Sequence, residues 1–363
     1  MDSLYIRNFK NFHKLTVENV GKINLIVGKN NVGKSSLLEA ISVYVTNGEE
    51  SWLRELLAAR GEAITEEKGE EIDAEEAKEH YVSLFAQWEE NYSYDFAITI
   101  GESATDKNAV HISQAYIKES RKNSSTVWET FNEEDLGHRI NRNSITGAGI
   151  IVRVGEQTSI IPYDKGRSFL STFNDKFPFR YVPIDAIQSF SNAKLFDKIS
   201  LSPEEDYVLE ALQIINPSIR KIGFVETNER LKSDRIAVVT IEGENKRFRL
   251  SSMGDGINRI LTVILNMVNC KNGVFLLDEF ETGLHYSVQT QLWQLIFVLA
   301  EKLNIQVFVT SHSNDCIKSF AEANKDGNGR LIRLSERKGE IVPTIYADNE
   351  DIKYAIDNDI EIR

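Results

Sequence analysis

The stretch INLIVGKNNVGKSSLLEAISVYV, residues 23–45, decides the fold of this chain. Its first part, INLIV, is typical of a buried strand, and its last part, SSLLEAISVYV, is typical of a helix that begins near Lys34. Between them, GKNNVGKS at 28–35 matches the pattern G-x-x-x-x-G-K-[ST]. A strand, a glycine-rich loop and a helix in this order predict a phosphate-binding loop.

Each position of this loop has a chemical reason. The two glycines let the backbone wrap closely, so that N–H groups point at phosphate oxygens, and the helix N-terminus adds the positive end of its dipole. Lys34 would supply charge to the β- and γ-phosphates, and Ser35 would offer a hydroxyl to Mg²⁺. A chance Gly-Lys turn would not explain the flanking strand and helix. The sequence therefore predicts an ATP and Mg²⁺ site formed by Gly28, Asn30, Asn31, Gly33, Lys34, Ser35 and Ser36.

The stretch GVFLLDEFETGLHY, residues 273–286, places carboxylates directly after an apolar run. Burying a carboxylate beside a strand is costly unless a cation or a reacting water needs it. Open α/β sheets bind ligands at the carboxyl ends of their strands. We therefore predict that Asp278 holds Mg²⁺, directly or through water, and that Glu279 accepts the proton of an attacking water. The alternative is a strand that simply ends in an acidic turn.

Two further segments are candidates for the same site. IQVFVTSHSNDC, from Ile305, predicts another buried strand, and His312 near its tip is predicted to contact the γ-phosphate. Taken alone, such a histidine is more often a surface residue or a cap. RLSSMGDGINRILTVILNMV at 249–268 places serines and glycines before an amphipathic helix. Locally, Ser251 or Ser252 would cap this helix. Functionally, the helix end would bind a nucleotide held by another subunit.

The other segments predict an α/β fold with a parallel sheet flanked by helices and an inserted α+β lobe. Residues 235–250 predict a hairpin, and helices alternate with buried strands from there to Phe320. Short strand-like runs between Tyr94 and Asp185 indicate an antiparallel or mixed lobe, and the acidic run at 61–80 indicates a solvated helix face or loop. The predicted division is an N-terminal core half at 1–47, the lobe at 48–185, a C-terminal core half at 186–325 and a short strand and helix extension at 326–363.

Composition limits the functional classes. The net charge of −13 argues against binding nucleic acid through bulk charge, although a local basic groove remains compatible with it. Two cysteines suit a reducing cytosol, so a cytoplasmic location is expected. The opening residues lack the apolar core of a signal peptide. Without an apolar run of about 18 residues, no membrane span is expected.

Taken together, these four elements resemble the ABC-class ATPases. In this resemblance, 28–35 is the Walker A loop, 250–256 the signature, 274–279 Walker B, and His312 the switch histidine. The opening segment, DEFETGLH and SSMGDGINR look like the RecF, SMC and OLD branch of that class rather than the transporters. The similarity covers roughly residues 1–45 and 220–325. Met253 and Asp255 depart from the transporter signature Leu-Ser-Gly-Gly-Gln.

The resemblance implies a head-to-tail homodimer with ATP between two heads, and leaves room for a higher oligomer. Residues implied to act in cis are Lys34, Ser35, Asp278, Glu279 and His312. Those implied to act across the dimer are Ser252 and Gly254 on the γ-phosphate, and Gly283 and Leu284 at the interface. The Q-loop glutamine is not obvious; Gln87 is the best candidate, although an ordinary surface role fits it better. Asn11 and Phe12 are weaker candidates for flanking the nucleotide.

The chain also resembles stand-alone OLD-like ATPases of bacterial defence or toxin systems, because about forty residues after the last core helix are too few for the Toprim nuclease domain of OLD enzymes. This implies an ATPase that controls a separate effector, a nuclease or a toxin. The alternative is a RecF-like ATPase that clamps DNA in repair, with short basic candidates at 230–235 and 246–249. A switch without turnover is disfavoured by Glu279, and a transporter subunit by the signature.

Overall fold

The computed structural model describes residues 1–59, 74–87, 96–122, 125–136, 138–163, 177–184, 189–226 and 235–357. The chain forms two compact units, which we treat separately. The first unit consists of Met1–Val20, Glu39–Lys176 and Glu336–Pro343. The second consists of Gly21–Leu38, Phe177–Ser335 and Thr344–Arg363. The phosphate loop, Asp278 and His312 belong to the second unit.

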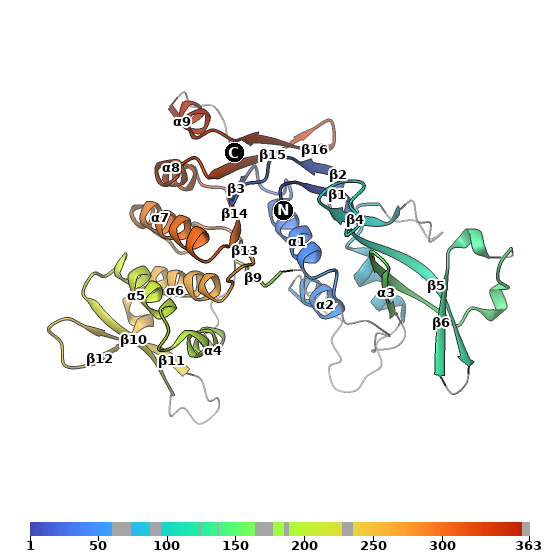
Figure 1. Ribbon diagram of the computed structural model, residues 1–363, viewed down its shortest axis with the longest axis horizontal. Coiled ribbons are helices and arrows are strands. Elements are labelled where there is room, and N and C mark those ends of the chain that lie inside the picture. The colour runs from blue at the N-terminus through green and yellow to red at the C-terminus, as the bar shows by residue number, and fades with distance from the viewer. Residues whose placement is uncertain are drawn as a thin grey trace. The chain divides into compact units, whose positions relative to one another are not determined.

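The second unit contains a six-stranded sheet in the order β16-β15-β3-β14-β13-β9 (Figure 1). From β15 to β9, neighbouring strands run parallel. All residues of β3 and β13 are buried, as expected for strands covered on both faces. The strands are β3 (Ile23–Val27), β9 (Phe179–Val182), β13 (Val274–Leu277), β14 (Gln306–Ser311), β15 (Gly329–Arg337) and β16 (Glu340–Tyr346).

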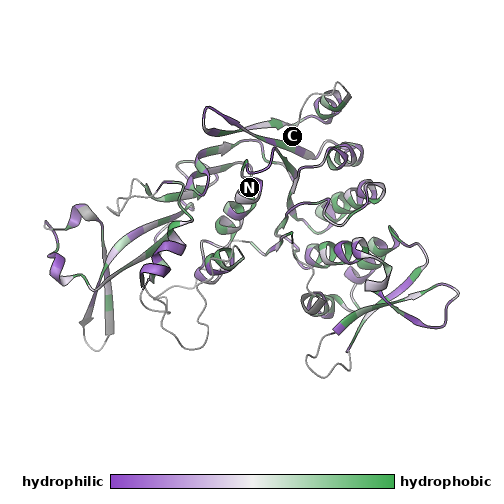
Figure 2. Cartoon of the chain, turned by 180° about the vertical axis from the view of Figure 1, so that it is seen from behind, coloured by the Kyte–Doolittle hydropathy of each residue, from purple (hydrophilic) through white to green (hydrophobic). Residues whose placement is uncertain are grey.

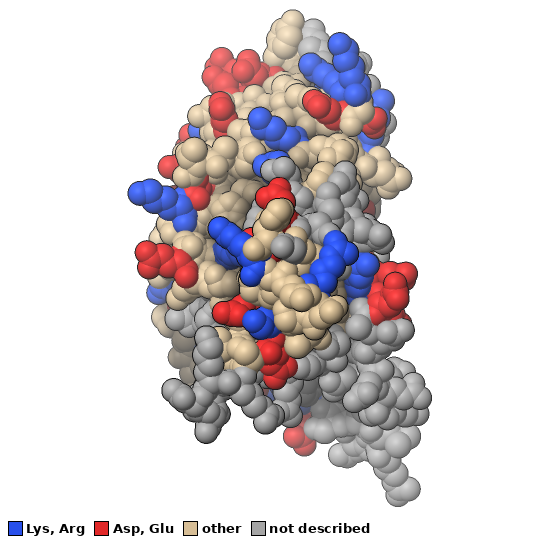
Figure 3. Space-filling model, turned by 90° about the vertical axis from the view of Figure 1, so that its right-hand side faces the viewer, with Lys and Arg blue, Asp and Glu red and all other residues tan. Residues whose placement is uncertain are grey.

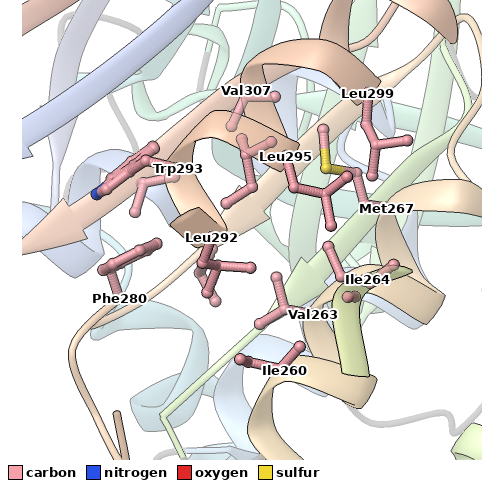
Figure 4. Packing of buried hydrophobic residues seen from close by; sticks show 14 of the residues in the cluster. Ile260, Val263, Ile264, Met267, Phe280, Leu292, Trp293, Leu295, Leu299 and Val307 are labelled. Carbon is pink, nitrogen blue, oxygen red and sulfur yellow. The ribbon is translucent and has the colours of Figure 1, made fainter. Parts of the chain in front are cut away.

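Helices alternate with β13 and β14 along the chain: α6 (Asp255–Val268), α7 (Tyr286–Lys302) and α8 (Asn314–Ala323). Figure 2 shows hydrophobic and hydrophilic residues together on these helices, as amphipathic helices require. Their apolar sides form the main core (Figure 4), where the rings of Phe280 and Trp293 stack at 4.4 Å between centroids. This architecture confirms the predicted α/β class.

A smaller layer of the second unit precedes α6. It contains α4 (Ser189–Ile199), α5 (Glu204–Gln213) and a three-stranded antiparallel sheet of β10 (Ile219–Glu226), β11 (Arg235–Ile241) and β12 (Arg247–Arg249). The predicted hairpin around Gly243 is therefore confirmed as β11 and β12. The C-terminal helix of this unit is α9 (Asn349–Asp357).

The first unit is built on a seven-stranded antiparallel sheet in the order β2-β1-β4-β5-β7-β8, with β6 paired to β5. Helix α1 (Lys34–Val45) begins in the second unit and ends in the first. The other elements are β1 (Leu4–Phe9), β2 (Phe12–Val17), α2 (Glu50–Ala58), α3 (Ala74–Val82), β4 (Ile98–Gly101), β5 (Val110–Lys122), β6 (Ser125–Phe131), β7 (Gly147–Val154) and β8 (Gln157–Pro162).

Three strands pair differently from the sequence-based expectation. β9, expected in the inserted lobe, pairs in parallel with β13. β1, expected in the ATPase core, pairs with β4 of the lobe segment. β15, expected in a C-terminal extension, pairs in parallel with β3 in the main sheet. The physical reason is that pairing depends on distant partners, which local alternation of residues does not specify. The acidic run at 61–80 lies outside the described residues up to 73.

Candidate functional site

The loop between β3 and α1 has a backbone that requires glycine. Gly28 has φ of 153° and Gly33 has φ of 96°. A Cβ on Gly28 would lie 2.6 Å from the backbone oxygen of Leu334 and 2.7 Å from Val32 Cγ1. Asn31 also has positive φ, 64°, which asparagine tolerates better than most residues. The loop therefore curls back on itself in front of the helix, as a phosphate cradle does.

The remaining predicted loop residues surround this cradle. Asn30 and Asn31 are exposed, and Ser35 and Ser36 lie half-buried in the first turn of α1. The Lys34 ammonium donates to the carbonyl oxygens of Gly28 at 2.9 Å and Lys29 at 3.1 Å. It therefore lies against the loop on which a phosphate would rest.

Lys34 and three carboxylates influence one another electrostatically. Burial lowers the pKa of the Lys34 ammonium, and the negative charges of Glu279, Asp278 and Glu281 oppose that shift. The fold thus brings the phosphate loop and the end of β13 together, although they are separated by more than two hundred residues in sequence. A lysine among carboxylates, beside a glycine loop, can accept a polyanion together with its cation.

Thr310, at the end of β14, connects the two acids that follow β13. Its hydroxyl donates to Asp278 Oδ1 and accepts the backbone N–H of Glu279 at 2.8 Å. Asp278 is 4% exposed and Thr310 is fully buried. Thr310 had no predicted role, because a threonine inside FVTSH carries no motif of its own.

Glu279 adopts a left-handed backbone, with φ of 49°. This conformation costs an L-residue about 1–2 kcal/mol, so the surroundings must hold it. Its side chain is about one-third exposed, and its Oε2 accepts the hydroxyl of Thr282 at 3.0 Å. A carboxylate held this way at a strand end can meet both a ligand and solvent water.

Arg259 of α6 helps to hold this backbone. The side chain is buried, and its Nη2 donates to the carbonyl oxygen of Asp278 at 2.8 Å and to that of Glu279 at 3.5 Å. Its Nη1 donates to the carbonyl oxygen of Pro183 at 3.1 Å. Arg259 had no predicted role either, although a cation within the apolar run INRILTVIL was a usable signal.

His312 follows β14 and lies beside two carboxylates. Its Nδ1 is 3.0 Å from Glu281 Oε1 and 3.8 Å from Glu279 Oε1. Its backbone N–H donates to the same Glu281 oxygen at 2.9 Å. The side chain of His312 is about half exposed. The structure therefore brings His312 to Glu279, and adds Glu281, an acid to which we had assigned no role.

The predicted signature segment forms an exposed helix start. Ser252 lies in the short 3-10 turn Leu250–Met253, and its hydroxyl donates to the carbonyl oxygen of Arg249 at 2.7 Å. Gly254, with φ of 101°, is the N-cap of α6 and provides no side-chain cap. Neither Ser251 nor Ser252 caps α6, contrary to the local alternative. The uncapped turn leaves N–H groups available to an anion.

Gly283 and Leu284, implied above to lie at the dimer interface, are next to this helix start. A Cβ on Gly256 would approach the carbonyl oxygen of Gly283 to 2.9 Å, while Gly283 itself, with φ of 73°, has open space around its Cα. Leu284 is partly buried against the main core.

The weaker candidates lie in the first unit. The Gln87 side chain is exposed, and its backbone N–H donates to Asn8 Oδ1 at 2.7 Å. Asn11 is exposed, whereas Phe12 is 1% exposed and forms part of a core, so its ring is not available to a nucleotide in this conformation.

The residues present fit a nucleoside triphosphate with its cation. A cradle that a Cβ would fill, an ammonium on two loop carbonyls and a buried carboxylate at a strand end are the features such a ligand needs. Within the described ranges, no group of three or more His, Cys, Asp and Glu is arranged to hold a metal by itself. A cation bound mainly through phosphates needs no such group.

Surface properties add two observations. Figure 3 shows lysines and arginines interspersed with acids over the described part of one face. Among all the residues that the structure describes, no helix has the length and apolar character needed to cross a membrane.

Comparison with solved structures concerns the fold. The chain is similar to an Smc head in a crystal structure with the C-terminal winged-helix domain of ScpA, with a TM-score of 0.51 and 14% identity. The similarity covers 97% of this chain and 99% of that one. This likeness shows that the chain has the fold of an Smc head.

Comparison of sequences adds chemistry. The chain is 24% identical to an ATP/GTP phosphatase of Helicobacter pylori over 385 aligned positions, which span 99% of this chain and 98% of that protein. A family model described as "AAA domain, putative AbiEii toxin, Type IV TA system" matches residues 23–315. The protein belongs to this family, and it is an ATP-hydrolysing P-loop enzyme.

Proposed function

We propose that this chain is a dimerising ATPase switch that controls a separate effector, and that hydrolysis occurs between the phosphate loop and the end of β13. The observation that carries the proposal is that the negative charges of Asp278, Glu279 and Glu281 act on Lys34, which lies beside a glycine cradle. These groups come from separate segments, and a chance loop would not gather them.

Each residue then has a chemical task. The loop N–H groups and Lys34 bind the β- and γ-phosphates and neutralise charge that develops on them. Ser35 and Asp278 would hold Mg²⁺, which supplies further charge stabilisation when bound. Glu279 orients the attacking water and accepts its proton, and its Thr282 contact keeps the carboxylate in place. His312 contacts the γ-phosphate.

Two substitutions test these tasks. Lys34→Ala should abolish nucleotide binding, measured by titration with a fluorescent ATP analogue. Glu279→Gln should keep binding and lower kcat by at least about 100-fold, because it removes the base. Glu322→Gln is a matched control, since Glu322 is exposed and its carboxylate accepts the hydroxyl of Thr290. Wild-type turnover by Glu279→Gln would show that another group is the base.

Hydrolysis is proposed to require two copies. The uncapped start of α6, with Ser252 and Gly254, would complete the site of the other copy, and Gly283 and Leu284 would lie at the interface. Open space around Gly254 and Gly283 supports this use, because a partner can approach both positions closely. The ATP-bound dimer would be the signalling state, which hydrolysis resets, and dimers could build into larger assemblies.

Light scattering of Glu279→Gln, with and without Mg-ATP, tests the dimer. A doubling of mass with Mg-ATP is expected. Adding Ser252→Glu should prevent the doubling without preventing nucleotide binding, because a carboxylate would face the γ-phosphate. Ser200→Glu, at another exposed position of the second unit, should leave the doubling intact. If the mass never changes, the switch model fails while the ATP site stands.

The effector role rests on the family description, which names a toxin system. We place this role in bacterial anti-phage defence in the cytoplasm, with partner specificity in the lobe at 48–185. Co-expression with the product of an adjacent gene should give a stable complex and protect cells from phage. Lys34→Ala should abolish the protection. A protein that neither associates nor protects would refute this pathway.

A second candidate function, DNA clamping, is favoured by one surface of the second unit. Lys221, Thr240 and Arg247 are cross-strand neighbours on β10–β12 and share a face, and Arg249 follows two residues later on that face. All three cations are exposed. If DNA binds through these three cations, the logarithm of the association constant should fall with the logarithm of the salt concentration with a slope of about −2 to −3. Salt-independent ATPase activity, unchanged by DNA, would exclude this function.

A further inference from the structure

Glu281 is the third acid of the segment after β13, and one of its oxygens makes two contacts with a single residue. Oε1 accepts the backbone N–H of His312 at 2.9 Å and lies 3.0 Å from its Nδ1. The carboxylate side chain is only 12% exposed. A largely buried carboxylate that accepts the backbone N–H of a histidine and lies 3.0 Å from its ring nitrogen restricts both its position and its rotation.

Glu279 does not make the same contact. Its Oε1 is 3.8 Å from His312 Nδ1, beyond hydrogen-bond distance, and its Oε2 accepts the hydroxyl of Thr282. The two acids therefore have different contacts and different roles. Glu281 holds the histidine, and Glu279 keeps an oxygen available for water.

We infer that Glu281 is a positioning residue for the ATPase reaction, acting through His312. It holds Nδ1 as a donor, so that Nε2 is the ring nitrogen left for the nucleotide. This inference rests on the proposed function for the role of His312. A carboxylate oxygen 3.0 Å from Nδ1 favours a proton on that nitrogen, because an ionised carboxylate accepts hydrogen bonds and does not donate them.

The chemistry at Nε2 follows from that contact. In the neutral ring, a proton on Nδ1 leaves Nε2 with a lone pair. A phosphate oxygen is itself an acceptor, so His312 binds it only when the ring carries a second proton. That second proton would lie on Nε2, the ring nitrogen that does not face Glu281. Glu281 thus sets the direction in which the ring meets the γ-phosphate.

The first test needs no variant. ¹⁵N spectra of the wild-type histidine side chains, recorded at a pH where His312 is neutral, report which ring nitrogen carries the proton. The chain has six histidines, and the signal that disappears in His312→Gln identifies the one required. A proton on Nδ1 is expected. A neutral ring protonated on Nε2 would overturn the inference, whether or not the protein hydrolyses ATP.

Variants then test the catalytic consequence. Glu281→Ala should lower kcat by about 10- to 100-fold with KM for ATP changed less than about threefold, because orientation is lost and binding is not. Glu281→Gln should recover most of the activity, since its amide oxygen can accept both contacts. Glu322→Ala is the control for removing a carboxylate from the second unit and should change neither kcat nor the spectrum.

The outcomes separate the two proposals. A folded Glu281→Ala with wild-type kcat would refute the positioning role, as would a Glu281→Gln no more active than Glu281→Ala. An inactive wild type whose His312 still carries its proton on Nδ1 would instead refute the proposed hydrolysis, and leave the contact to Glu281 in place.

Discussion

Replacing Thr310 by valine should weaken the site and the fold together. Thr310 is fully buried, and valine has nearly its shape, so the change removes a hydroxyl without opening a cavity. Two bonds are lost: the one donated to Asp278 Oδ1 and the one accepted from the Glu279 N–H. The first satisfies a buried carboxylate, and the second holds the strained backbone of the proposed base.

The magnitude follows from these two bonds. A hydrogen bond to a charged group contributes about 1.5–3 kcal/mol, and stranding a buried N–H costs about 1–3 kcal/mol. Thr310→Val should therefore lower the free energy of unfolding by about 3–5 kcal/mol, out of a total of about 5–15 kcal/mol. For a domain of about 200 residues this corresponds to a fall in Tm of about 6–20 °C.

Thr310→Ser is the matched control, because it keeps the hydroxyl and removes only the methyl group. Urea denaturation followed by circular dichroism should show a loss of about 1 kcal/mol for Thr310→Ser and the larger loss for Thr310→Val. The kcat of ATP hydrolysis should fall more for Thr310→Val as well. If Thr310→Val is as stable and as active as Thr310→Ser, the hydrogen bonds of the Thr310 hydroxyl do not support the site.

Three further predictions concern other contacts. Gly28→Ala should weaken nucleotide binding at least about 10-fold in a titration with a fluorescent ATP analogue. The alanine Cβ would lie 2.6 Å from the backbone oxygen of Leu334, and the positive φ disfavours alanine. Unchanged affinity would contradict the loop geometry. Lys10→Met should cost about 3–5 kcal/mol in urea, because it removes the ammonium 2.6 Å from the buried Glu39 carboxylate, and adding Glu39→Gln should recover part of the loss if that contact causes it. Burial, and then the charge of Arg153, lower the pKa of His111 below its ordinary 6.5, although the charge of Asp106 opposes this shift. Below pH 6.5 the unfolded chain therefore binds more protons than the folded chain, so the free energy of unfolding should fall as the pH drops. His111→Gln should remove that part of the acid sensitivity in denaturation curves recorded between pH 5 and pH 7.

Much of the fold and the site could be predicted because the signals are local. The phosphate loop, the buried strand before it and the helix after it lie within 23–45, where spacing and residue type are enough. The same holds for Asp278 and Glu279 after VFLL. In both cases the signal comes from residues that are close together in the sequence. The parallel sheet then brings the carboxyl ends of its strands to one edge.

Tertiary structure alone decided the partners of these residues. The sequence contained Thr310, Arg259 and Glu281, but their contacts join β13 to β14 and α6, which no local pattern specifies. The strand neighbours of β1, β9 and β15 were decided in the same way. By itself the sequence determined which groups could bind and cleave a phosphate. Packing determined which side chains hold them in position, because hydrogen bonds and strand pairs form between segments far apart in the chain.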